Sequence, residues 1–98
     1  MKAQLLVDRR VILSARGFAE LVLWRLPRPA EGSAHSYKYR LAYVVDGVCV
    51  LRFDNEAGKG DHRHVDGKES PITFTDPDQL LGDFLREVMR WNDENGHS

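Results

Sequence analysis

The chain has 98 residues and a formal net charge of −1, and 42% of its residues are hydrophobic. These values predict a single soluble domain over residues 1–98 and exclude a disordered chain. The one cysteine, Cys49, excludes an internal disulfide framework and a multi-cysteine zinc site, and it suits a reducing cytoplasm. Charged residues interrupt the first 26 positions, so neither a secretion signal nor a membrane span is expected.

The N-terminal part of the chain predicts three strands. Short apolar runs at residues 4–7 and 11–13 indicate two strands joined by a tight turn at residues 8–10. Residues 18–26 are rich in aliphatic and aromatic side chains, as is typical of a central strand. Pro27 ends this strand because proline cannot donate to a β ladder.

A β-hairpin is predicted in the middle of the chain. Asp46-Gly47, a strong signal for a two-residue turn, separates the runs 37–45 and 48–55. With that turn, the numbers of facing residues sum to 93, so Leu41 is expected opposite Arg52. The open end of the hairpin then gathers polar side chains: Lys38, Arg40, Arg52, Asp54, Asn55 and Glu56.

The C-terminal half predicts a loop followed by a helix. Residues 56–70 are polar and contain several glycines, which indicates a functional loop, and residues 72–74 predict a short edge strand. A helix over about 76–92 is expected, with Asp76 or Thr75 as its cap and an apolar stripe at helical spacing. The predicted fold class is α+β, with an antiparallel sheet of four to five strands over about 3–55 and one C-terminal helix packed on a face.

Two histidines of the predicted loop, His62 and His64, are candidates for acid–base chemistry. Imidazole changes its charge near neutral pH, and residues two apart in an extended segment point the same way. Both imidazoles also sit among fixed charges, whereas His35 is expected to lie in solvent. The candidate catalytic residues are His62, His64, Lys59, Arg63 and Asp61; the candidate substrate-binding residues are Lys38, Arg40 and Arg52, and Asp54 and Glu56 are candidate supporting residues.

The charges are distributed unevenly along the chain. Residues 1–40 contain eight Lys/Arg and three Asp/Glu, whereas residues 41–98 contain six Lys/Arg and twelve Asp/Glu. Such asymmetry hints at an interaction surface. The alternative is that these charges form sheet-edge ion pairs and solvated loops.

The sequence resembles the TumE-like family of small bacterial and archaeal proteins. The segments that carry the resemblance are 37–41, 52–56 and the run Gly58-Lys59-Gly60-Asp61-His62-Arg63-His64, and it extends from about Lys2 to Trp91. The resemblance implies the toxin component of a two-gene toxin–antitoxin system, with a helix-turn-helix antitoxin as its partner. RNA and a second copy of the chain are further expected partners, and no membrane is expected.

The leading hypothesis is a ribonuclease that needs neither metal nor cofactor. His62 and His64 would remove the 2′-hydroxyl proton and protonate the departing oxygen, while Lys59 and Arg63 offset phosphoryl charge. Asp61, Asp54 or Glu56 would orient an imidazole, as a carboxylate does in a triad. That small toxins of comparable architecture cleave RNA is an analogy between folds.

Two alternatives remain open at the level of the sequence. His62 and His64 with Asp61, Asp54 and Glu56 supply nitrogen and oxygen ligands for a metal-dependent site. In the second alternative, the basic residues bind RNA phosphates or an acidic antitoxin surface without any catalysis.

Overall fold

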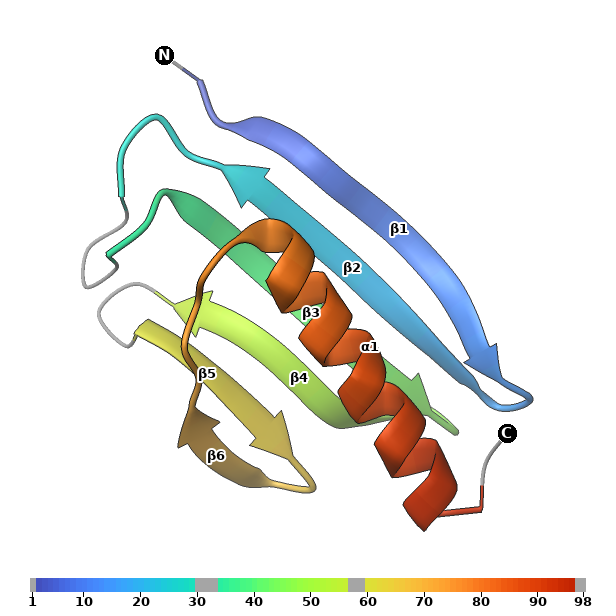
Figure 1. The fold of residues 1–98 in the computed structure, drawn as a ribbon. Coiled ribbons are helices and arrows are strands. Elements are labelled where there is room, and N and C mark those ends of the chain that lie inside the picture. The colour runs from blue at the N-terminus through green and yellow to red at the C-terminus, as the bar shows by residue number, and fades with distance from the viewer. Residues whose placement is uncertain (1, 30–33, 57–59, 97–98) are drawn as a thin grey trace.

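In the computed structural model, which describes residues 2–29, 34–56 and 60–96, one antiparallel sheet carries a helix across one of its faces (Figure 1). Six strands follow one another across the sheet in chain order, which confirms the α+β class with more strands than predicted. The elements are β1 (Gln4–Ser14), β2 (Gly17–Arg25), β3 (Tyr37–Val45), β4 (Val48–Glu56), β5 (Gly60–Val65), β6 (Lys68–Pro71) and α1 (Pro77–Glu94).

The two predicted N-terminal strands are one strand, β1, and the predicted turn at residues 8–10 is wrong. Asp8, Arg9 and Arg10 all pair with β2, and Arg10 donates a hydrogen bond of 2.7 Å to Glu20 across the ladder. Because β1 lies at the edge of the sheet, solvent reaches its charged side chains, and a polar run need not end the strand.

The predicted loop over 56–70 is also wrong, because β5 and β6 form a second hairpin there. Its turn is Asp66-Gly67, with φ angles of 49° and 83°, close to the 51° and 80° of the confirmed turn Asp46-Gly47. Two successive positive φ angles define the type I′ turn that suits a two-residue hairpin. Residues 72–74 form no strand, contrary to the prediction, and connect β6 to the helix.

The helix begins as predicted. Asp76 is the N-cap and accepts a hydrogen bond of 2.8 Å from the backbone N–H of Gln79, and Pro77 occupies the first turn. The helix packs its apolar stripe on the sheet through the buried side chains of Leu80, Phe84 and Val88. No helix in the described part of the chain is long and apolar enough to cross a membrane.

The register of the central hairpin differs from the prediction beyond its first two pairs. A β-bulge in β4, opposite the step between Tyr43 and Val44, shifts the pairing by one residue, so that facing numbers no longer sum to 93. The shift brings the apolar residues of both strands onto the face that α1 covers, where they form the core. The pairs beyond the bulge are Tyr43 with Leu51, Ala42 with Arg52, Leu41 with Phe53 and Arg40 with Asp54.

The bulge therefore assigns the polar residues of β3 and β4 to a face. We call the side of the sheet that α1 covers the helix face, and the other side the open face. Strand alternation and cross-strand pairing put five candidate side chains on the open face: Arg40, Arg52, Asp54, His62 and His64.

Candidate functional site on the open face

The strand β5 divides the predicted catalytic run between the two faces of the sheet. His62 pairs with Asp54 and His64 pairs with Arg52, so both imidazoles lie on the open face. Asp61 and Arg63 alternate with them and point to the helix face. The prediction that His62 and His64 share a side therefore holds, but the run does not form one site.

On the open face, both imidazoles converge on one carboxylate. The Nε2 atom of His62 lies 2.7 Å from Asp54 Oδ1, and the Nε2 atom of His64 lies 3.8 Å from the same oxygen. The two rings meet edge to face with centroids 4.9 Å apart. The side chains of His62 and Asp54 are 7% and 8% exposed, whereas that of His64 is 24% exposed, so solvent enters this cluster through His64.

Neighbouring groups hold the cluster of Asp54, His62 and His64 in place. The Nδ1 atom of His62 lies 3.0 Å from the carbonyl oxygen of Gly60, and Arg52 Nε lies 2.8 Å from Asp54 Oδ2. Glu69, on β6, reaches the rim, where its carboxylate oxygens lie 3.7 Å from His62 Nε2 and 3.9 Å from His64 Nδ1. The cluster thus combines two imidazoles with carboxylates and a guanidinium.

The remaining candidates for substrate binding lie on neighbouring strands. Arg40 is exposed and pairs with Asp54 across the ladder, and Lys38 lies two residues away on the same strand and is also exposed. Glu56 pairs with Gly60 at the end of the β4–β5 ladder. Lys59 and the side chain of Glu56 lie outside the described residues.

On the helix face, Asp61 belongs to a different cluster. Its Oδ1 accepts a hydrogen bond of 2.5 Å from the hydroxyl of Tyr39 and lies 2.8 Å from Nε2 of His35. His35 is not in solvent as expected, because its ring stacks on Phe74 with centroids 3.8 Å apart. Burial, and then the hydrogen bond to the Asp61 carboxylate, raise the pKa of the Tyr39 hydroxyl above its ordinary value. Asp61 therefore supports the packing of this edge.

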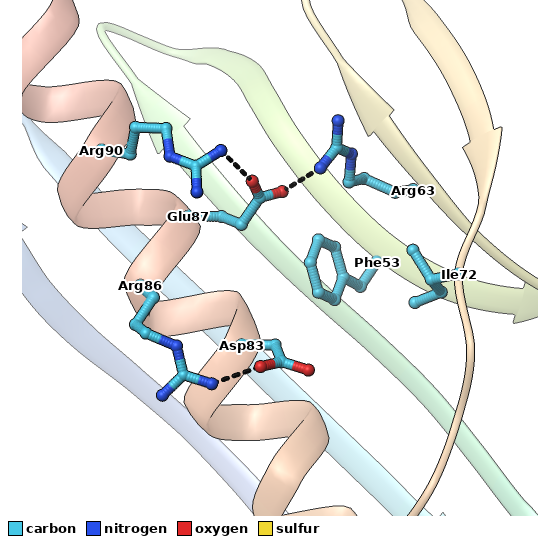
Figure 2. A pocket seen from close by; sticks show the side chains of 7 residues that line it. All are labelled: Phe53, Arg63, Ile72, Asp83, Arg86, Glu87 and Arg90. Atoms are coloured by element: carbon cyan, nitrogen blue, oxygen red, sulfur yellow. Dashed lines mark hydrogen bonds and ion pairs between the residues drawn. The ribbon is translucent and has the colours of Figure 1, made fainter.

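Arg63 lies in a pocket of about 280 Å³ between the sheet and the helix (Figure 2). It donates a hydrogen bond of 2.6 Å to Glu87, whose other oxygen lies 3.3 Å from Arg90. Arg86 is paired with Asp83 on the same wall. Because each guanidinium of this pocket faces a carboxylate, the pocket ties β5 to α1 and is separate from the open-face cluster.

Sequence reasoning missed the roles of His35 and Glu69. The dipeptide Asp66-Gly67 could have located Glu69, because it is the same turn signal as Asp46-Gly47 and pairs β6 with β5. No local signal identifies the contact between His35 and Asp61, which are 26 residues apart.

Comparison with protein families gives one finding. The family model described as "Toxin TumE" matches residues 2–92, which include the open-face cluster and most of the helix. Comparison with curated proteins and with solved structures gave no match.

Proposed function

The chain belongs to the TumE toxin family, and on this premise we propose that it acts in the cytoplasm by cleaving RNA at the open-face cluster. Membership makes it the toxin component of a toxin–antitoxin system, with an antitoxin as its partner. The proposal concerns the chemistry of the toxin, and the residues that would carry it are those that converge on Asp54.

The observation that carries the proposal is the convergence of His62 and His64 on one buried carboxylate. RNA is cleaved when a base removes the 2′-hydroxyl proton and an acid protonates the departing 5′-oxygen, and imidazole performs both tasks near neutral pH. In our proposal the two imidazoles carry one proton transfer each. Asp54, 2.7 Å from His62 Nε2, would stabilise the positive charge that develops on this ring during the reaction.

Basic side chains of the open face support RNA as the substrate. Arg52 lies beside Asp54, and Arg40 and Lys38 extend the positive charge along β3. Guanidinium and ammonium groups bind phosphate oxygens and stabilise charge that develops on them. The proposed reaction needs no metal, and it does not use Asp61 or Arg63, which are engaged on the helix face.

Incubation of the purified toxin with a structured RNA, with and without a chelator, tests the proposal. We expect cleavage in both samples and fragments that end in a 2′,3′-cyclic phosphate, because attack by the 2′-oxygen leaves that group. Binding of RNA that weakens steeply with salt, without any fragment, would replace catalysis with phosphate binding alone.

We propose that the antitoxin is a helix-turn-helix protein that covers the open-face cluster. The exposed side chains of Arg40 and Lys38 favour a partner surface with acidic residues there. Charge reversal at both positions should therefore weaken the complex and slow its formation, as measured by the association rate at low salt. An unchanged rate would direct attention to α1 as the binding surface.

The edge strand β1 supports a homodimer as a further proposal. In the part of the chain that the structure describes, no strand pairs with its outer backbone edge, and Ile12 on this strand is 73% exposed. Antiparallel pairing of two copies about Arg9 would bring Asp8 opposite Arg10 of the second copy, so the strand is complementary to itself. The mass in solution tests this pairing, and an Arg10→Asp variant should shift a dimer to monomer.

A further inference from the structure

The open-face cluster also has the composition and geometry of a metal site. We propose that Asp54, His62 and His64 bind one divalent transition-metal ion such as Zn²⁺. Two imidazole nitrogens and one carboxylate oxygen form a donor set that suits Zn²⁺ and its neighbours in the first transition row. The proposal concerns ion binding, and it holds whether or not RNA is the substrate.

The three ligand atoms are close enough to share an ion. They all lie within 4.8 Å of one another, with individual separations of 2.7 Å and 3.8 Å from Asp54 Oδ1 to the two Nε2 atoms. Metal–ligand distances of about 2.0–2.2 Å put two ligands of one ion roughly 3.0–3.5 Å apart. The 2.7 Å pair would have to open by a few tenths of an ångström and His64, the most exposed of the three, would have to move closer by a similar amount, so small side-chain rotations give this geometry.

The polar atoms at the centre of the cluster are not satisfied by hydrogen bonds. Asp54 is 6% exposed, yet among the described residues its Oδ1 has no partner in hydrogen-bond geometry, and neither has Nε2 of His64. The 2.7 Å contact between His62 Nε2 and Asp54 Oδ1 is therefore short without being a hydrogen bond. Buried oxygen and nitrogen atoms are rarely left in this state, and an ion between them would satisfy both.

The surroundings of His62 select the nitrogen that a metal needs. Its Nδ1 lies 3.0 Å from the carbonyl oxygen of Gly60, which can only accept, so Nδ1 carries a proton and donates it. In the neutral ring, Nε2 then bears the lone pair, and this lone pair is on the side of Asp54. Metal-binding histidines characteristically donate their second nitrogen to a carbonyl or carboxylate in this way.

Two further charges lie near the proposed ion. Arg52 Nε forms an ion pair with Asp54 Oδ2 at 2.8 Å without hydrogen-bond geometry, so its charge is balanced on that side of the carboxylate and Oδ1 remains for the ion. Glu69 is half exposed and lies 3.7 Å from His62 Nε2, so its carboxylate offsets the positive charge of Arg52 and can approach the ion from the solvent side. The predicted metal ligand Asp61 takes no part, because it lies on the helix face.

One consequence rests on the proposed function. An ion bound to both Nε2 atoms occupies the nitrogens that would transfer protons, so metal binding and metal-free RNA cleavage exclude each other. We therefore expect Zn²⁺ to inhibit cleavage and a chelator to restore it. Cleavage that continues at full rate in the Zn²⁺-saturated protein would contradict this consequence but not the site itself.

The test of the site is calorimetric titration of the tag-free full chain with Zn²⁺, without any RNA. Its variants are His64→Gln and Asp54→Asn, and the matched control is His35→Gln, which removes a histidine from the helix face. Circular dichroism of each variant establishes that it is folded. Titration with Co²⁺, followed by visible absorption, reports the ligand geometry independently.

We expect the wild-type chain and His35→Gln to bind one Zn²⁺ with the same affinity. Loss of even an outer-sphere partner typically lowers metal affinity about 10- to 100-fold, so loss of a ligand in His64→Gln should lower it by at least roughly 100-fold. The proposal is overturned by a wild-type chain that binds neither ion, or by equal affinities of His64→Gln and His35→Gln. Should Asp54→Asn unfold, the variant at His64, whose side chain is 24% exposed, still decides the outcome.

Discussion

The two faces of the β4–β5 pair contain carboxylates in opposite states. On the helix face, the carboxylate of Asp61 has hydrogen-bonding partners in Tyr39 and His35, and Arg63 is bonded to Glu87. On the open face, the carboxylate of Asp54 lies between two imidazoles with one oxygen unsatisfied. Arg63 Nε on the helix face also lacks a hydrogen-bond partner among the described residues, so the contrast lies in the carboxylates: that of Asp61 is hydrogen-bonded, whereas Oδ1 of Asp54 is not.

This contrast separates structural charges from candidates for function. A buried polar group that has partners contributes to stability, whereas one that lacks them costs free energy and persists where a substrate or ion completes it. We therefore expect substitutions on the open face to change activity at nearly constant stability. Substitutions on the helix face should do the reverse.

The largest effect is expected for the histidines of the open face. Replacing His62 or His64 with alanine should lower the rate of RNA cleavage by about 10²- to 10⁴-fold, since each removes one proton-transfer group. Growth of cells that express each variant without the antitoxin measures the effect. Full toxicity of both variants, at wild-type protein levels, would remove the histidines from the mechanism.

The carboxylates offer a matched pair of substitutions. Asp54→Asn should lower cleavage by about 10-fold or more, because the neutral amide no longer stabilises the imidazolium that forms during the reaction. Asp61→Asn should retain activity but lower the free energy of unfolding by about 1–3 kcal/mol, because the buried contacts to Tyr39 and His35 weaken. Cleavage rates and urea unfolding of both variants provide the comparison, and a reversed pattern would contradict it.

Two glycines of the scaffold should respond oppositely to alanine. A Cβ at Gly17 would lie 2.5 Å from the hydroxyl oxygen of Tyr43, which itself donates a hydrogen bond of 2.7 Å to Asn92 of the helix. Gly17→Ala should therefore destabilise the fold by about 1–3 kcal/mol. Gly82→Ala, where the nearest atom is 3.5 Å away on flexible Arg86, should stabilise the helix by up to about 1 kcal/mol. Thermal unfolding of both variants tests whether the melting temperature falls for Gly17→Ala and rises for Gly82→Ala.

The smallest effect near neutral pH concerns Tyr39. Its pKa is raised in the folded state, so above the ordinary tyrosine pKa of about 10 the unfolded chain loses this proton while the folded chain keeps it. Below pH 10 the contribution of Tyr39 to the free energy of unfolding is fully present. Above pH 10 this free energy should fall by about 1.4 kcal/mol per pH unit. The free energy of unfolding of Tyr39→Phe, measured with urea between pH 8 and 11, should lack this fall above pH 10. The same pH dependence in the variant and the wild-type chain would refute the assignment to Tyr39.

Local signals in the sequence predicted the parts of the fold that depend on them. The turn Asp46-Gly47 and the cap Asp76 are both observed as expected, because each conformation is determined by two or three neighbouring residues. The register of β4 was mispredicted because a bulge that satisfies the core shifts the strand by one residue. Asp61 and Arg63 lie on the opposite face from the two histidines because side chains alternate along a strand. This could be predicted only if residues 60–65 were recognised as a strand.

In our proposal the open-face cluster is the functional centre of this toxin. The most direct test compares initial rates of cleavage of one labelled RNA by the wild-type chain, His64→Gln and His35→Gln, each shown to be folded. We predict that His35→Gln cleaves at the wild-type rate and that His64→Gln cleaves at least about 10²-fold more slowly. Equal rates for the two variants would contradict the claim, because the two faces would then contribute alike.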